Sequence, residues 1–202
     1  MKKREIISKQ INLFPAKDNK SLAQLVNPFV VKAALEKEGK FHEFPEQGMK
    51  QVAWDDMFLI LSENPTKISI GSNTPAAGSK INEDLIKILE FTKSYKDIGG
   101  IGVNYNMFVE KDDETLDGIL FKGKLDGVTR SISKEYTLKN SILTVMIAEG
   151  MMELDGKAKK GFIVSLNYHF KPAETKAKEF LSMDLLESSK ALEILVALGI
   201  TD

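Results

Sequence analysis

Two stretches of this chain, "GIGVNYNMFVE" at 100–110 and "GFIVSLNYHF" at 161–170, alternate their side chains in the way that most restricts the fold. Successive side chains of a β-strand point to opposite faces of its sheet, so the alternation predicts two strands, each with an apolar face. The residues expected on the apolar faces are Ile101, Val103, Tyr105, Met107 and Val109 in the first strand, and Phe162, Val164, Leu166, Tyr168 and Phe170 in the second.

The two stretches also repeat the pair Asn-Tyr, followed each time by a polar residue. If both are strands, Asn104, Asn106, Asn167 and His169 lie on the faces away from the tyrosines. Amide and imidazole groups brought together in this way form a candidate surface for a polar ligand or a partner's backbone. The simpler interpretation is that an antiparallel sheet has one wet face and alternation alone places these residues there. The sequence favours the simpler interpretation and leaves both open.

The rest of the chain predicts an α+β fold with a mainly antiparallel sheet, built from two hairpins and further strands and packed by helices. A first strand is expected at 4–14, ended by Pro15, and a helical turn after Ser21. The hairpins are expected at 57–72, around a turn at 63–66, and at 141–170. Helices are expected near 82–96, with Asn82 as N-cap and glycines 99 and 100 at the end, at 173–183 and at 185–197. With no linker-like segment, we expect residues 1–202 to form a single domain.

Three segments are harder to interpret. Residues 27–44 can begin a helix, because Asn27 is a good N-cap and Pro28 suits the first turn, but their apolar residues also alternate as in a strand. The stretch "KFHEF" also looks extended. We favour a helix, with Gly39 beyond its end, and leave helix or strand open for 27–44. A short helix is expected at 113–121, and residues 124–140 are expected to be irregular and exposed.

Composition excludes several classes of function. The chain has no Cys, which excludes disulfides, thiolate catalysis and Cys-bound metals. Charged residues make up 28% of the chain and nearly cancel, and only Arg4 and Arg130 carry a guanidinium, which argues against a nucleic-acid partner. No apolar segment follows the basic "MKKREIISKQ", and the apolar runs are too short to cross a bilayer. We therefore expect a soluble cytoplasmic protein with no membrane partner.

The near-motifs for enzymes and metal sites fail on spacing. "GSNTPAAGSK" at 71–80 lies where a phosphate-binding loop belongs, but six residues separate its glycines and Ser79 precedes Lys80. "DETLDGILFKGK" at 113–124 begins like a calcium loop, yet Lys124 stands where a glutamate must bind the ion. The two histidines, His42 and His169, have no metal-site spacing. The sequence predicts no cofactor and no metal, and we recognise no catalytic residues.

The C-terminal helix carries more apolar residues than one buried stripe needs. If part of it is exposed, Ile194 and Leu198 offer a contact for a second helix. The expected function is protein binding, by self-association or to a macromolecular partner, as in an accessory or inhibitor factor of a phage or mobile element. The alternative is an enzyme or sequesterer that acts on a polar small molecule such as a nucleotide.

Overall fold

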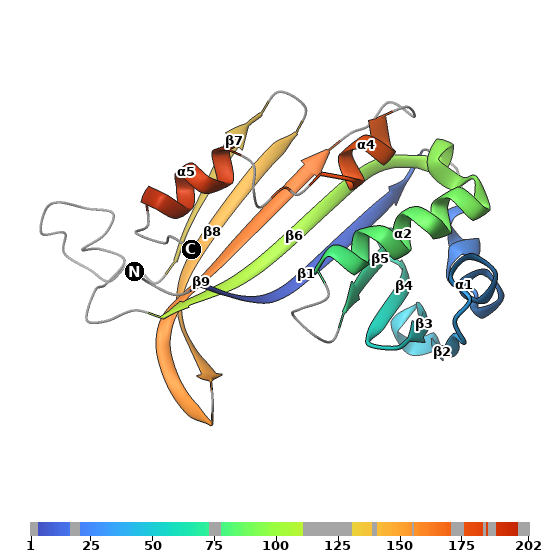
Figure 1. Ribbon diagram of the computed structural model, residues 1–202, viewed down its shortest axis with the longest axis horizontal. Helices are drawn as coiled ribbons and strands as arrows, with labels where there is room; N and C mark the ends of the chain where they lie inside the picture. The colour runs from blue at the N-terminus through green and yellow to red at the C-terminus, as the bar shows by residue number, and fades with distance from the viewer. Residues whose placement is uncertain are drawn as a thin grey trace, which may run out of the picture.

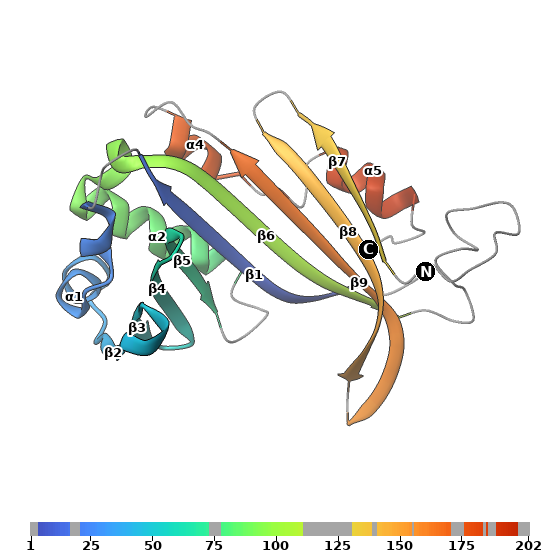
Figure 2. The same cartoon turned by 180° about the vertical axis from the view of Figure 1, so that it is seen from behind.

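In the computed structural model, one antiparallel sheet runs through the chain, and the helices lie against one of its faces. The structure describes residues 4–16, 21–72, 78–110, 131–138, 141–154, 156–170, 176–183, 185 and 189–197. Within these ranges nine strands form the sheet: β1 (Arg4–Pro15), β2 (Lys40–Phe44), β3 (Met49–Trp54), β4 (Met57–Glu63), β5 (Thr66–Ser72), β6 (Ile98–Glu110), β7 (Ser131–Thr137), β8 (Ile142–Leu154) and β9 (Lys157–Phe170). The helices stand in front of the sheet in Figure 1 and behind it in Figure 2.

The strand order is β2-β3-β4-β5-β1-β6-β9-β8-β7, and every neighbouring pair is antiparallel. The predicted mainly antiparallel sheet is therefore confirmed. The predicted hairpins correspond to the pairs β4–β5 and β8–β9. They are parts of a larger arrangement, because β2 to β5 form a four-stranded meander and β1 lies between β5 and β6.

The apolar faces of the central strands form the core, as their alternation predicts. The five apolar-face residues expected in β6 and the five expected in β9 are all buried. Ile11 and Leu13 of β1 join the same core, and the helices supply its other side. Burial of one face of each strand determines the register, since a shift by one residue would turn the apolar side chains outward.

Residues 27–44 contain both of the structures that their sequence allows. Helix α1 spans Pro28–Leu35, and the Asn27 side chain accepts a hydrogen bond of 2.9 Å from the Phe29 backbone N–H, which caps the helix. The helix ends at Glu36 in a left-handed conformation. The chain then becomes extended as β2, so only the first part of the segment is helical.

Helix α2 spans Gly78–Thr92, and this corrects two predictions. Asn82 lies inside the helix and does not cap it; its side-chain Nδ2 donates to the carbonyl oxygen of Leu181. Glycines 99 and 100 do not end the helix but belong to β6. Gly99 is required there by close approach, because a Cβ at this position would lie 2.7 Å from the Pro15 carbonyl oxygen. The helix ends earlier, and a short 3-10 turn, Ser94–Asp97, leads into β6.

The segment predicted to be irregular at 124–140 contains strand β7, and this prediction was wrong for 131–137. β7 pairs with β8 from Ser131 opposite Ala148 to Thr137 opposite Ile142. Only Ile132 and Tyr136 are half-buried, with Lys134 between them on the same face. The apolar signal of this edge strand is therefore too sparse to stand out in the sequence.

The remaining predicted helices are described in part, because residues 173–175 and 186–188 lie outside the described ranges. The turn after Ser21 is a 3-10 helix, Ser21–Leu25, and the C-terminal helices are α4 (Ala177–Leu181) and α5 (Ser189–Ala197). Leu185, where the last helix was expected to begin, is buried ahead of α5. The helix expected at 113–121 lies outside the described residues.

Candidate functional site

The face of the sheet away from the described helices is the candidate site, and we call it the open face (Figure 2). Alternation along the strands and the strand register place on it Ser8, Gln10, Asn12 and Phe14 of β1; Phe58, Ile60 and Ser62 of β4; Ser69 and Gly71 of β5; Gly100, Gly102, Asn104, Asn106 and Phe108 of β6; Ile142, Thr144, Met146 and Ala148 of β8; and Ile163, Ser165, Asn167 and His169 of β9.

The residues named above, which form the middle of the open face, include no Lys, Arg, Asp or Glu, although 28% of the chain is charged. Charged residues lie at its borders: the same registers place Glu5 opposite Phe108, Lys67 opposite Ser62 and Glu135 opposite Thr144. Glu110 forms an ion pair there with Lys159, and Lys40 lies on the edge strand β2. Between these borders the open face combines amides, hydroxyls, glycines and apolar side chains, with Ile142 and Met146 among its exposed apolar residues.

All four residues predicted as a polar surface lie on this face, on the neighbouring strands β6 and β9. Asn104 is directly opposite Asn167, and Gln10 of β1 is opposite Asn104, so three amides form a row across three strands. Neighbouring strands are about 4.8 Å apart, which brings such side chains within contact distance. The side-chain Oδ1 of Asn104 is buried and has no hydrogen-bond partner among the described residues, whereas Asn167 is exposed.

Asn106 is separated from that row by its own hydrogen bonds. Its Nδ2 donates to the Ser8 hydroxyl at 3.0 Å, and its Oδ1 accepts from the Ser165 hydroxyl at 2.6 Å. The three side chains connect β1, β6 and β9 next to the register shift between Ile6 and Ser8. Asn106 therefore links strands, and both parts of its amide are already engaged.

His169 belongs to an aromatic part of the open face. It lies opposite Gly102, and its ring is 5.9 Å from the ring of Phe14 in an edge-to-face arrangement. The Phe14 ring also covers Gly102, since a Cβ at that glycine would be 3.5 Å from it.

Two other aromatic side chains also lie over a glycine of the next strand: Phe58 lies over Gly71, and Phe108 lies over Gly161. Sequence reasoning did not predict these pairs. The only signal was a glycine in the interior of a strand, which often marks such a close approach.

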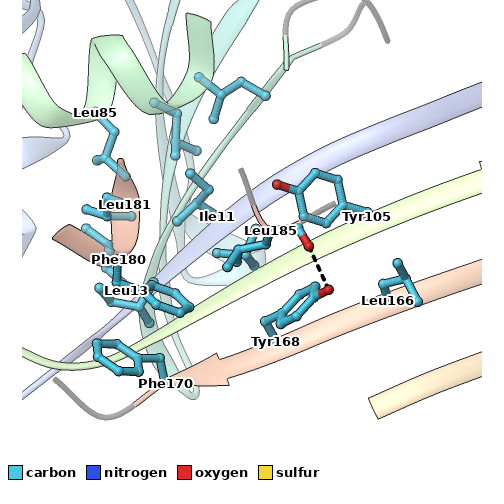
Figure 3. Close-up of a cluster of buried hydrophobic side chains, with 14 of the residues drawn as sticks. Ile11, Leu13, Leu85, Tyr105, Leu166, Tyr168, Phe170, Phe180, Leu181 and Leu185 are labelled. Atoms are coloured by element: carbon cyan, nitrogen blue, oxygen red, sulfur yellow. Dashed lines mark hydrogen bonds between the residues drawn. The ribbon is translucent and has the colours of Figure 1, made fainter. Parts of the chain in front are cut away.

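The two tyrosines of the repeated Asn-Tyr face the core, as predicted. Their rings meet edge to face with centroids 6.4 Å apart, and the Tyr168 hydroxyl donates to the Leu185 carbonyl oxygen at 2.8 Å (Figure 3). This bond attaches the segment before α5 to β9. The tyrosines therefore have a structural role, and the polar residues beside them are the part of the repeat that faces outward.

The C-terminal helix presents its apolar side chains unequally. Ile194 is 8% exposed and belongs to the core, so its side chain offers little surface to another helix. Val196, on the same helix, is 60% exposed. Leu198 lies outside the described residues.

One buried cluster has the residue types of an enzyme site. Asp84 of α2 is almost completely buried and accepts 3.0 Å hydrogen bonds from the Trp54 indole N–H and from the Lys37 ammonium. Lys37 also lies 3.4 Å from Asp55, which Lys80 approaches at 3.3 Å. Burial opposes the charge of Lys37, but the hydrogen bonds and charges of Asp84 and Asp55 outweigh it and raise its pKa. The bonds from Lys80 and Lys37 lower the pKa of Asp55.

In this cluster each carboxylate is matched by an ammonium group, and the bonds connect α2, the end of β3 and the α1–β2 connection. We interpret it as a structural link. It also engages Lys80, the lysine of the failed phosphate-loop motif; residues 73–77 of that motif and residues 113–124 of the failed calcium loop lie outside the described residues. In the described ranges no three His, Asp or Glu side chains gather where they could hold a metal ion. Nor does any described helix have the length and apolar character to span a membrane.

No model of a known protein family matches the chain, and no curated protein matches it in sequence. The function is therefore argued from the open face itself.

Proposed function

We propose that this chain is a single α+β domain that acts by protein–protein contact through its open face, either with a macromolecular partner or with a copy of itself. The observation that carries the proposal is the lack of charged side chains in the middle of this face, while charged residues lie at its borders. The centres of protein interfaces are depleted in charged residues and are bordered by polar ones, which is the distribution found here.

The physical reason is desolvation. A partner that covers an ionised side chain must remove its water, which costs several kcal/mol unless an opposite charge replaces it. Amides and hydroxyls lose less, and they offer donors and acceptors to the partner. The exposed Met146 adds an unbranched, adaptable apolar side chain of a kind enriched at interfaces.

A second candidate is binding of a polar, uncharged small molecule at the amide row. It is favoured by the Asn104 Oδ1, a buried acceptor without a partner. A nucleotide fits the amide row less well, because its phosphates need cations and the middle of the described open face supplies no Lys or Arg.

The test is to add a charge at an exposed position of the open face. Asn167→Glu and Met146→Glu are suitable because both side chains are exposed and the fold should tolerate the change. Phe91→Glu is the matched control, since Phe91 is an exposed apolar residue on α2. Affinity capture from native host cells and analytical ultracentrifugation would measure partner binding and self-association.

We expect the wild type and Phe91→Glu to retain the same partner or the same oligomer, and both open-face variants to lose it. The proposal fails if the wild type is monomeric and captures nothing. It also fails if the open-face variants bind as well as the control. The second candidate predicts instead that a monomeric protein is stabilised against heat by an uncharged polar ligand, and that Asn104→Ala removes this effect.

A further inference from the structure

The two edges of the described sheet differ in how they are protected. Natural sheets usually keep their edges from pairing with other chains by placing charges, prolines or covering elements there. On β7 the exposed side chains are Ser, Thr, Lys and Glu, and the half-buried Tyr136 is covered by Lys190 of α5, whose Nζ lies 5.1 Å from the ring centroid. On β2 all five residues are exposed, and two of them are Phe41, 45% exposed, and Phe44, 39% exposed.

A third exposed phenylalanine lies on helix α1, which is next to β2. Gly39, directly before β2, packs against α1 so closely that a Cβ there would lie 3.1 Å from the Cα of Pro28. The beginning of the helix is therefore close to the start of β2, and Figure 1 shows α1 and β2 at the same end of the sheet. The next residue, Phe29, is 80% exposed, the highest value among the large apolar residues described. Three of the four most exposed phenylalanines in the described residues thus lie on the neighbouring elements α1 and β2.

The charges at this corner are unequally matched. Glu43 faces Lys50 across the β2–β3 pair at 3.2 Å. In contrast, Lys40 and His42 form no ion pair within the described chain. These two residues lie on the same side of β2 as Phe44, opposite the uncharged Ala53 and Gln51 of β3. On the open-face side of β2, the Lys40 ammonium is therefore not neutralised by a described carboxylate. On the opposite side of β2, which faces the helices, lies Phe41.

We propose that β2 accepts an extended segment of a partner protein as an additional antiparallel strand. The outward main-chain N–H and C=O groups of an edge strand are best satisfied by another extended chain, which specifies the shape of the occupant. The side chains specify its composition: an apolar residue beside Phe41, and acidic residues on the alternate positions beside Lys40 and His42. This site is the main-chain edge of β2 and rests on other residues than the amide row in the middle of the open face.

The probe is a short synthetic peptide of alternating valine and glutamate, blocked at both ends and carrying a fluorophore for anisotropy titration. One control peptide replaces glutamate by lysine, and a second has a backbone N-methylated at alternate residues so that it cannot complete the strand pairing. The protein variants are Lys40→Glu and Phe41→Ser, with Phe91→Ser as the matched control on α2. Hydrogen exchange measured by mass spectrometry locates the contact.

We expect the valine–glutamate peptide to bind the wild type and Phe91→Ser equally, and to protect the amides of 40–44. Lys40→Glu and Phe41→Ser should each weaken binding by about tenfold. The lysine peptide and the N-methylated peptide should bind at least that much more weakly. Equal binding to all variants, undiminished binding of the N-methylated peptide, protection at β7 in place of β2, or no binding would each overturn the proposal. So would a wild-type dimer that Phe41→Ser dissociates without any peptide, because the occupant would then be a second copy of the chain.

Discussion

The pairing of a large side chain with a glycine on the next strand leads to a sharp prediction about stability. Gly161 of β9 lies under the ring of Phe108, and a Cβ added there would come within 2.7 Å of the ring atom Cε2 and would also press on the Val109 carbonyl oxygen. Gly102 of β6 is also covered by a ring, but its added Cβ would lie 3.5 Å from Phe14, an ordinary contact distance. Neither glycine has a positive φ, so alanine can adopt both backbone conformations and only the available space differs.

Gly161→Ala should therefore destabilise the fold, while Gly102→Ala should not. Forcing an extra carbon into a packed site costs about 2 kcal/mol, and here part of the obstacle is backbone that cannot rotate away. At a compatible position, alanine restricts the unfolded chain and stabilises by about 0.5 kcal/mol. The free energies of unfolding of the two variants should thus differ by about 2.5 kcal/mol. In urea denaturation followed by circular dichroism, this separates their midpoints by about 1 M.

Adding Phe108→Leu to Gly161→Ala should recover only part of the loss, because the Val109 carbonyl oxygen stays in place. If Gly161→Ala unfolds at the same urea concentration as Gly102→Ala, then the Phe108 ring and β9 can move apart without a loss of stability. The inferred tight packing of the open face would then be wrong.

Two further changes test the buried polar groups. Asp84→Ala leaves the Lys37 ammonium and the Trp54 indole N–H without their acceptor. It should therefore lower the free energy of unfolding, measured by urea denaturation, by about 3 kcal/mol. A loss below about 1 kcal/mol would show that the buried Asp84–Lys37 pair is not a structural link. Burial and the nearby charge of Glu90 raise the pKa of Tyr95 to about 12. Between pH 10 and that value the unfolded chain loses the Tyr95 proton and the folded chain keeps it, so the free energy of unfolding should fall as the pH rises. Tyr95→Phe should reduce this fall. If the wild type and Tyr95→Phe lose stability equally between pH 10 and 12, the raised pKa of Tyr95 is wrong.

The elements predicted most reliably from the sequence were those in which apolar and polar residues alternate regularly. β6 and β9 alternate apolar and polar residues through most of 101–107 and 164–170, so their buried faces followed directly from the pattern. β1 was harder, because Lys9 occupies a core-facing position. Its ammonium lies 5.2 Å from the Tyr105 ring centroid, a contact between strands that local sequence does not show. The α1–β2 boundary was ambiguous because the same residues satisfy both periods until Glu36 adopts a left-handed conformation.

The candidate site was predictable in part. Alternation was sufficient to place Asn104, Asn106, Asn167 and His169 on one face. Alternation could not show that Asn106 is hydrogen-bonded to Ser8 and Ser165, because these two bonds join three strands that only the fold brings together. The lack of charges in the middle of the open face depends on which six strands are neighbours, and the sequence contains that order only indirectly. Asn82 was assigned to a cap for a related reason, since its Leu181 partner comes from a distant helix.

The central place of β1 has a consequence for how the protein is made. β1 is the first strand of the described chain, yet both of its neighbours, β5 and β6, are synthesised after it, and pairs such as Arg4 with Val109 are on the order of a hundred residues apart. While the chain emerges from the ribosome, the meander β2–β5 can form early, but β1 keeps an unpaired edge until β6 is released. Closing so long a loop is slow, and the waiting edge can pair with other chains. Cell growth conditions that slow translation beyond residue 72 would therefore lengthen the period in which the nascent chain is most prone to aggregate.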